Sequence, residues 1–270
     1  MKIYRIALVG LAFGVCPHYA SALDTAEAVS GNGAPALSVP EVPVAEVLPA
    51  KVQPGVITAV KRADFAGEQA SVEVRHIADW AVDAGDNKGL PYLIIDKLNA
   101  KLFVFDAQGR IRGAAPVLLG LARGDHTVPG IGDRELSKIR PDERTTPAGR
   151  FVATRGMSTR GVDVVWVDYE SGVSLHRVIN GNRKDRRLER LATPTAADNR
   201  ISYGCINVPV AFYNQVVNPS FTQSDAIIYV LPEVRPMREV FASYDVESRQ
   251  QYAAPAPANS PVIKTSSSPQ

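Results

Sequence analysis

The chain has 270 residues, with 30 Lys and Arg against 28 Asp and Glu, so its formal net charge is only +2. Nucleic-acid binding needs a clear basic excess, because it depends on neutralising many phosphates. The charge balance therefore argues against a nucleic acid as the main partner, while the length is sufficient for a domain with a substantial core.

The first 22 residues have the pattern of a secretory signal peptide. Lys2 and Arg5 form a charged start, residues 6–15 an apolar core, and residues 20–22 (Ala-Ser-Ala) a cleavage site of small residues. The apolar run is too short to span a bilayer, and no later stretch of the sequence is long and apolar enough. We therefore expect signal cleavage, no stable membrane insertion, and a protein that is periplasmic, secreted or associated with the cell wall.

Two segments of biased composition flank one candidate domain. Residues 23–65 are rich in Ala, Pro and Val and show no helical or strand period, so we expect a semi-extended linker. Residues 249–270 contain Ala-Pro and Ser-Ser-Ser-Pro runs and are expected to be a disordered tail. Residues 66–248 are therefore the predicted folded domain.

The predicted domain begins with a helix and continues mainly as strands. Ser71 suits the N-cap and Gly85 the end of this helix, and its apolar residues share one face: Val74, Ile77, Ala78 and Ala81. Residues typical of strands then dominate the ranges 92–96, 101–106, 110–119, 150–155, 163–169, 172–179 and 225–231. Many short strands with few helices predict a mainly β fold, a sandwich or a barrel-like sheet.

A long segment without a helix or strand pattern, residues 121–147, interrupts these strands. It contains three glycines and ends in Arg-Thr-Thr-Pro. Long loops of this kind in compact domains tend to be functional, so we expect this one to lie near a site.

Cys205 is the candidate nucleophile. Cys16 would leave with the signal peptide, so Cys205 would be alone in an oxidising compartment, where structural cysteines normally pair. An unpaired thiol in that setting is better explained by reactivity. The alternative is a small buried apolar residue, which is the common role of a free cysteine.

The residues around Cys205 predict a turn from a strand into a helix. Gly204 suits a tight turn, and Pro209 suits the first turn of a helix whose apolar positions are 210, 212, 213, 216 and 217. The positive end of a helix dipole would favour the thiolate over the thiol. The unpaired N–H groups of such a turn could also bind the oxyanion of a tetrahedral intermediate.

A thiol nucleophile needs a base within hydrogen-bond reach and a group that orients the base. Three histidines lie beyond the predicted signal peptide: His76 in the predicted helix, His126 in the long loop and His176 at the end of a strand. We favour His176, because a strand holds a side chain more firmly than a loop does. His126 is the alternative base, and a structural role is the alternative for His176.

Three segments in this order resemble the catalytic domain of the L,D-transpeptidase family. That family shows Thr-Pro-x-Gly-x-Phe, a strand histidine, and Ser/Thr-His-Gly-Cys followed by a branched apolar residue and Asn or Arg. The matching segments here are Thr146-Pro147-Ala148-Gly149-Arg150-Phe151, Leu175-His176 and Ile201-Ser202-Tyr203-Gly204-Cys205-Ile206-Asn207. The resemblance runs from about Pro91 to Pro232.

The resemblance implies a β-sandwich-like fold with a few short helices and a cysteine acyltransferase that acts on peptidoglycan stem peptides. Cys205 would be the nucleophile and His176 the general base. Backbone N–H groups around Tyr203, Gly204 and Cys205 would form the oxyanion site, with Ser202 and Asn207 supporting the cysteine loop. No metal or organic cofactor is expected, and we expect a monomer.

Three departures from the family pattern predict an altered choice of substrate or acceptor. Tyr203 stands where the family usually has a second histidine, and Arg177 stands where a glycine is common. The segment between His176 and Cys205 is also longer than usual and strongly charged. A backbone-built oxyanion site would be unaffected by the tyrosine, so we expect catalysis to persist.

The charged run at residues 183–190 permits two interpretations. Mixed charges usually form a solvated helix face. Arginine forks also bind carboxylates, such as those that end stem peptides. Arg200 and Arg177 are the individual arginines predicted to bind substrate.

The leading hypothesis is an exported acyltransferase that forms a thioester on Cys205 and cross-links or modifies the cell wall. The alternatives are a non-catalytic peptidoglycan-binding domain, and an L,D-carboxypeptidase or amidohydrolase that uses the same Cys–His pair. A cysteine peptidase of another fold is a more remote alternative, because no local signature of that class surrounds Cys205.

Overall fold

The structure, a computed structural model, describes residues 59–253, with side chains described as far as residue 249. The predicted signal peptide and most of the predicted linker and tail lie outside the described residues. Phe65, the last residue assigned to the linker, is buried against Phe103 and Phe105. Helix α6, Val246–Ala253, extends into the segment predicted as the tail.

An eight-stranded sheet forms the centre of the described domain, in the order β3-β2-β1-β10-β5-β6-β7-β9. Two further short strands, β4 and β8, pair in parallel. The strands are β1 Tyr92–Asp96, β2 Lys101–Phe105, β3 Ile111–Pro116, β4 Leu119–Gly120, β5 Gly149–Met157, β6 Asp163–Asp168, β7 Val173–Arg177, β8 Arg200–Ser202, β9 Ile206–Val208 and β10 Ala226–Val230. This arrangement confirms the predicted mainly β fold.

The helices of the described region are short. They are α1 Val72–Asp83, α2 Arg187–Ala192, α3 Val210–Phe212, a π-helical stretch at Tyr213–Val217, α4 Asn218–Ser220, α5 Met237–Val240 and α6; single 3₁₀ turns lie at Ile131–Asp133, Leu136–Lys138, Pro141–Glu143 and Arg183–Asp185. Among residues 59–253, no helix has the length and apolar character needed to cross a membrane.

The central strands bury both of their faces, which explains their continuous apolar sequences. In β1, Leu93 and Ile95 point into the core that includes the interior of the sheet and the π-helical stretch. Tyr92 and Ile94 point the other way, into a second core covered by α1. Strand side chains alternate between faces, so one five-residue strand contributes to two cores.

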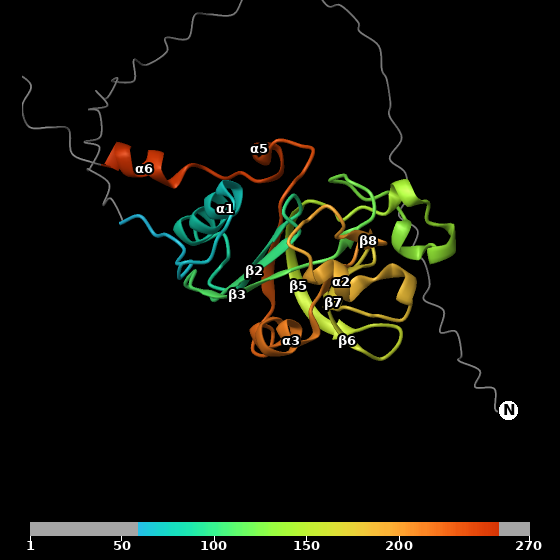
Figure 1. The fold of residues 1–270 in the computed structure, drawn as a ribbon. Coiled ribbons are helices and arrows are strands. Elements are labelled where there is room, and N and C mark those ends of the chain that lie inside the picture. Colours follow the sequence, from blue (N-terminus) through green and yellow to red (C-terminus); the bar gives the residue numbers. More distant parts are fainter. Residues whose placement is uncertain (1–58, 254–270) are drawn as a thin grey trace, which may run out of the picture. The chain divides into compact units, whose positions relative to one another are not determined.

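Helix α1 forms where the sequence predicts it. Ser71 caps it, with its hydroxyl accepting a hydrogen bond from Val74 N at 3.3 Å. The four predicted apolar positions are fully buried against the sheet. Figure 1 shows α1 on the same side of the β1–β2–β3 part of the sheet as α6. The prediction of this helix is confirmed.

The strand predicted over residues 110–119 is two strands in the structure. Strand β3 pairs with β2 and ends at Pro116, which has no N–H to continue the ladder. The chain then crosses to a new partner, where Leu118 exchanges two backbone hydrogen bonds of 2.9 Å with Asn207. This crossover brings β4 beside β8 and the cysteine segment.

The loop of residues 121–147 is fixed by a buried cluster of four charged side chains. Lys97 Nζ lies 2.7 Å from Asp125 Oδ1 and 3.6 Å from Glu233 Oε1, and neither Lys97 nor Glu233 has any exposed side-chain surface. Arg200 completes the cluster with an ion pair of 2.6 Å to Glu233. Lys97 Nζ also donates to the carbonyls of Gly124 (2.6 Å) and Thr146 (2.9 Å), so it holds both ends of the loop.

Asp125 is the most hydrogen-bonded carboxylate of this cluster. Besides Lys97, the backbone N–H groups of Glu233, Val234 and Arg235 donate to it at 2.7–2.9 Å. Burial acts to raise the pKa of Asp125, but these hydrogen bonds outweigh burial and lower the pKa to about 2. A carboxyl whose pKa is depressed by folding stabilises the folded state above its unfolded pKa and loses that contribution as the pH falls.

We therefore expect Asp125→Asn to lower the free energy of unfolding at neutral pH, and we expect this loss to become smaller in acid. The stability difference between wild type and variant should narrow by about 2 kcal/mol as the pH falls from above 3.8 to about 2. Urea unfolding at a series of pH values measures this difference. A gap that stays constant over that range would contradict the prediction.

Candidate active site

Cys205 lies in the short turn between β8 and β9, and not at the start of a helix. The helical segment predicted after Pro209 does form, but it begins at Val210, after β9. The prediction that a helix dipole acidifies the thiol is therefore wrong. Ile206 and Val208 are branched and fully buried in the sheet core, so the segment after the cysteine is extended.

Gly204 gives the cysteine turn its shape. Its φ is +130°, and a Cβ atom at this position would lie 2.7 Å from the carbonyl oxygen of Thr145, so only glycine fits. Ser202 closes the turn: its Oγ accepts from Gly204 N at 3.1 Å and donates to Cys205 O at 2.6 Å. The backbone before the nucleophile is therefore rigidly held.

Thr146, the first residue of the Thr-Pro-x-Gly segment, supports the same turn. Its side chain is fully buried, accepts from Gly120 N at 2.9 Å and donates to Gly204 O at 2.8 Å. Because Lys97 binds the carbonyl of Thr146, the buried charged cluster is connected to the cysteine turn by two successive contacts.

Strand β7 presents two polar side chains to Cys205. Ser174 and His176 are two residues apart and share a face of the strand, while Leu175 between them is buried in the core. Ser174 Oγ lies 3.7 Å from Cys205 Sγ, and the thiol donates to Gly172 O at 3.6 Å. The parallel pairing of β7 with β9 sets His176 opposite Asn207.

The hydrogen-bond partners of His176 assign its tautomer. Nδ1 lies 2.7 Å from the carbonyl oxygen of Arg177, which can only accept, so Nδ1 carries the proton. Nε2 lies 3.3 Å from Asn207 Nδ2. The ring is thus oriented by a backbone carbonyl, and Nε2 is the nitrogen left to exchange a proton with the thiol.

The pKa values of the two groups are displaced in opposite directions. Burial acts to raise the pKa of the Cys205 thiol, but interactions with His176 and with the amide and hydroxyl of Ser174 outweigh it and lower the pKa. Burial acts to lower the pKa of His176, but the interaction with Cys205 outweighs it and raises the pKa. Both shifts favour a thiolate beside an imidazolium.

Two backbone donors of the cysteine turn are not used by the fold. Gly204 N–H is already bound to Ser202 Oγ, so it is not available as an oxyanion donor. The N–H groups of Tyr203 and Cys205 have no acceptor within residues 59–253. These two are the backbone groups that could bind a developing oxyanion.

Tyr203 interacts through its ring. The guanidinium of Arg144 lies 3.9 Å from the ring centroid, and Arg144 also donates to the carbonyl of Ile139 at 3.0 and 3.2 Å. In the part of the chain that the structure describes, the phenol oxygen makes no hydrogen bond. Tyr203 therefore anchors the long loop through a cation–π contact.

The two arginines predicted to bind substrate are engaged within the fold. Arg200 binds Glu233 and the carbonyl of Lys97. The guanidinium of Arg177 binds Asp163 at 2.8 Å and stacks 4.2 Å from the ring centroid of Tyr213. A substrate carboxylate would have to compete with these partners, and substrate binding by either arginine stays a prediction.

The other two histidines of the described region have different surroundings. His126 is exposed in the loop, and only its backbone carbonyl makes a hydrogen bond, accepting from Thr145 Oγ1 at 2.5 Å. His76 bonds to Ser243 at 3.0 Å. Neither ring makes a hydrogen bond to Cys205 within residues 59–253.

Sequence reasoning missed Ser174 and Arg187. The strand alternation that aims His176 at the cysteine also aims Ser174, so the pattern could have identified it. Arg187 was part of an undifferentiated charged run, yet its NH1 donates to Asn207 Oδ1 at 2.7 Å. No sequence signal distinguishes it from its charged neighbours.

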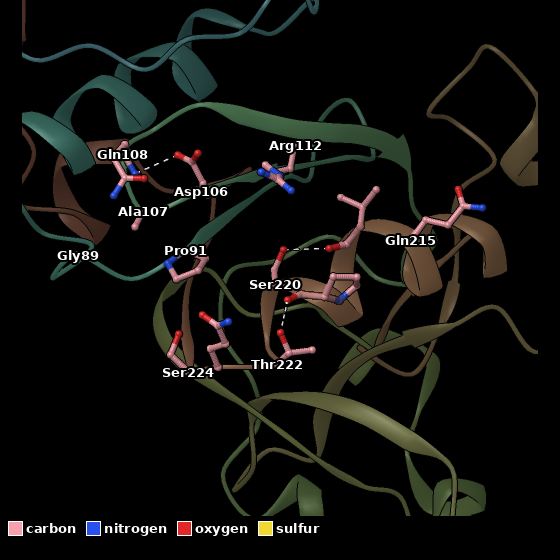
Figure 2. Close-up of a pocket in the computed structure, with 13 residues that line it drawn as sticks. Gly89, Pro91, Asp106, Ala107, Gln108, Arg112, Gln215, Ser220, Thr222 and Ser224 are labelled. Carbon is pink, nitrogen blue, oxygen red and sulfur yellow. Dashed lines mark hydrogen bonds between the residues drawn. The ribbon is translucent and has the colours of Figure 1, made fainter.

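The cavity drawn in Figure 2 is separate from this site. It has a volume of about 490 Å³ and lies at the end of β1 that begins after Pro91, whereas Lys97 and the cysteine turn lie past the other end. Its acidic residue, Asp106, is already bound by Arg110 and by the backbone of its own turn. The cavity holds no candidate nucleophile beyond serine and threonine hydroxyls.

The described residues offer no group of three or more His, Cys, Asp or Glu side chains placed to hold a metal ion. The chemistry available at the site is that of a thiol, an imidazole, a hydroxyl and backbone amides.

Replacing Ser174 by Ala should raise the pKa of the Cys205 thiol, because the thiolate loses a hydrogen bond from the hydroxyl. A hydrogen bond to a charged group corresponds to a shift of about 1 unit. The rate of alkylation by iodoacetamide against pH reports this pKa. Ser224→Ala, at an exposed serine of the cavity in Figure 2, is the matched control and should leave the profile unchanged. Identical profiles for all three proteins would contradict the assignment of Ser174.

Comparison with solved structures finds distant similarity to L,D-transpeptidase domains. The helical cell shape determining protein Pgp2 from Campylobacter jejuni aligns with a TM-score of 0.36 and 14% identity, over 54% of this chain and 49% of that chain. An L,D-transpeptidase from Xylanimonas cellulosilytica aligns with a TM-score of 0.33 and 16% identity, over 52% of this chain and 60% of that chain. The catalytic domain of an E. faecium L,D-transpeptidase aligns with a TM-score of 0.28 and 16% identity, over 52% of this chain and 95% of that chain. This chain thus spans about half of Pgp2 and 60% of the Xylanimonas protein. No protein-family model and no curated protein matches the chain. The similarity is therefore one of structure at low sequence identity.

Proposed function

We propose that this protein is an exported cysteine acyltransferase that acts on peptidoglycan stem peptides through a thioester on Cys205. The observation that carries the proposal is that β7 sets Ser174 Oγ 3.7 Å from Cys205 Sγ, and that Asn207 Nδ2 bonds both to His176 Nε2 and to the carbonyl of Cys205. The pKa values of Cys205 and His176 are displaced in the matching directions, downward for the thiol and upward for the imidazole. A structural cysteine would not need an oriented imidazole and a strand hydroxyl around its sulfur.

The first half-reaction uses the thiolate as the nucleophile. The sulfur attacks the carbonyl carbon between the third residue of a stem tetrapeptide and its terminal D-alanine, and the negative charge moves to the carbonyl oxygen. The unpaired N–H groups of Tyr203 and Cys205 are the candidate donors to this oxyanion. When the carbon–nitrogen bond breaks, Nε2 of the His176 imidazolium gives its proton to the leaving amine, and a thioester remains.

The second half-reaction returns the enzyme to its starting state. An acceptor amine attacks the thioester and gives its proton to His176, and the carbon–sulfur bond breaks to restore the thiolate. A second stem peptide, a free D-amino acid or a protein amine would each satisfy this chemistry, and water would give hydrolysis. Cross-linking, exchange, anchoring and carboxypeptidase activity therefore share the same first half-reaction.

The substrate class rests on the sequence motifs. Two of the three matching segments contribute to the same turn: Thr146 binds the carbonyl of Gly204, and Ser202 closes the turn. The third segment supplies His176 on the neighbouring strand. A resemblance that recurs in the contacts around one thiol supports the family's chemistry more strongly than three separate matches would. The signal-peptide pattern supports export to the compartment that holds this substrate.

The decisive test is acylation of Cys205 by a carbapenem, detected by intact mass. A reactive thiolate should open the β-lactam ring and gain the full mass of the carbapenem. Cys205→Ala should gain none, because no other cysteine lies beyond the predicted signal peptide. His176→Ala should react more slowly by roughly 10²–10⁴, as expected on losing a general acid–base group.

His126→Ala is the matched histidine control for this test and should acylate at the wild-type rate. If His176→Ala is acylated normally and His126→Ala is not acylated, the general base is His126 and not His176. An unreactive wild-type protein that still binds peptidoglycan would support the non-catalytic alternative. Release of D-alanine from tetrapeptide without incorporation of a labelled D-amino acid would indicate a carboxypeptidase.

Tyr203→Phe should acylate within about tenfold of wild type, about 1.4 kcal/mol, because the phenol oxygen makes no hydrogen bond in the described region. Phenylalanine also keeps the ring that Arg144 stacks on. Tyr203→Ala is the comparison variant and should lose more acylation activity, since it removes the ring that Arg144 stacks on. Burst amplitude with a chromogenic β-lactam measures both. A loss near a thousandfold in Tyr203→Phe would assign a catalytic role to the phenol.

A further inference from the structure

Arg187 joins the charged segment of residues 183–190 to the candidate active site. It is the first residue of α2, and only 17% of its side chain is exposed. Its Nε donates to Asp185 Oδ2 at 3.0 Å, which fixes the guanidinium, and its NH1 donates to Asn207 Oδ1 at 2.7 Å. Asn207 lies in β9, which pairs with β7, the strand that carries His176.

Asn207 passes this contact on to His176. The residue is 1% exposed, so its amide is oriented by protein partners and not by water. With Oδ1 bound to Arg187, the NH₂ group faces Nε2 of His176 at 3.3 Å and the carbonyl of Cys205 at 3.4 Å. An amide whose oxygen is held in one direction must present its two donors in the other.

We propose that Arg187 is a positioning residue, which orients the Asn207 amide so that its NH₂ group and not its oxygen faces Nε2 of His176. In this orientation the amide donates to the lone pair of the neutral imidazole. Protonation of Nε2 would instead set two donors against each other. The Arg187–Asn207 pair therefore disfavours the imidazolium, whereas Cys205 favours it.

The charge of Arg187 acts in the same direction as the amide. The charged or titratable groups that face His176 are Cys205 from the cysteine turn and Arg187 from α2, with Asp185 bound behind Arg187. The positive charge of Arg187 lowers the pKa of His176, against the larger raising effect of Cys205. A general acid must release its proton as readily as it takes it up, so a moderated imidazolium suits both half-reactions.

The functional meaning of this arrangement rests on the proposed function, but the arrangement can be measured without any substrate. In a Cys205→Ser background the thiolate is absent, and the pKa of His176 can be followed by NMR of the imidazole ring. We expect Arg187→Gln to raise that pKa by roughly one unit. Arg186→Gln is the matched control and should leave the pKa of His176 unchanged. The side chain of Arg186 is 72% exposed, and within the described residues its one ion pair is with Glu189.

A second pair of variants separates the amide orientation from the charge. In an Asn207→Ala background no amide can turn, so Arg187→Gln should raise the pKa of His176 by a clearly smaller amount. Arg187→Lys keeps the charge and a donor, so the pKa of His176 in this variant should stay near its value in the protein with Arg187. This variant also tests the proposal if Arg187→Gln folds poorly. Equal shifts in both backgrounds, or no shift in either, would overturn the positioning role. If the pKa of His176 shifts as expected but the wild-type protein forms no acyl-enzyme, the proposed function is contradicted while the positioning role of Arg187 stands.

Discussion

The buried ammonium group of Lys97 is the interaction on which the site depends most. It is fully enclosed, and burial acts to lower its pKa while the charges of Asp125 and Glu233 oppose that change. Removing one member of such a cluster leaves an uncompensated buried charge, which costs about 3–5 kcal/mol. Because Lys97 also binds the carbonyls at both ends of the long loop, the same ion cluster that closes the loop sets the position of Thr146 and, through it, the cysteine turn.

A second constraint is the parallel pairing of β7 with β9. It puts the end of one strand beside the start of the other, so His176 and Asn207 face each other across the pair and the cysteine precedes β9 directly. The imidazole is then held on both nitrogens, by a backbone carbonyl on one side and an amide on the other. Groups held in this way need little rearrangement when charge develops at the sulfur, which is the condition for preorganised catalysis.

Local features of the fold could be predicted from the sequence, whereas features that depend on pairing could not. The apolar face of α1 and most strand ranges follow from period and composition, because each reflects burial of a continuous local pattern. The helical segment after Pro209 was predicted correctly, but the placement of Cys205 at its start was wrong. Ile206 and Val208 are buried in the core as strand β9, which a local reading of Pro209 cannot show. Cys205 and His176 could be named from motifs, but their contacts with Ser174 and Arg187 depend on strand register and on the fold of the charged segment.

The thiol owes its acidity to residues from β7 and its geometry to residues from the loop and the turn, which are far apart in sequence. An unfolded chain therefore carries an ordinary cysteine, which at neutral pH is mostly protonated and a poor nucleophile. Acidity arises only when β7 and β9 have paired and Thr146 has bound the turn. Under the proposed function, a chain not yet folded would be inert toward amides and strained rings during export, and completion of the sheet would itself make Cys205 a nucleophile.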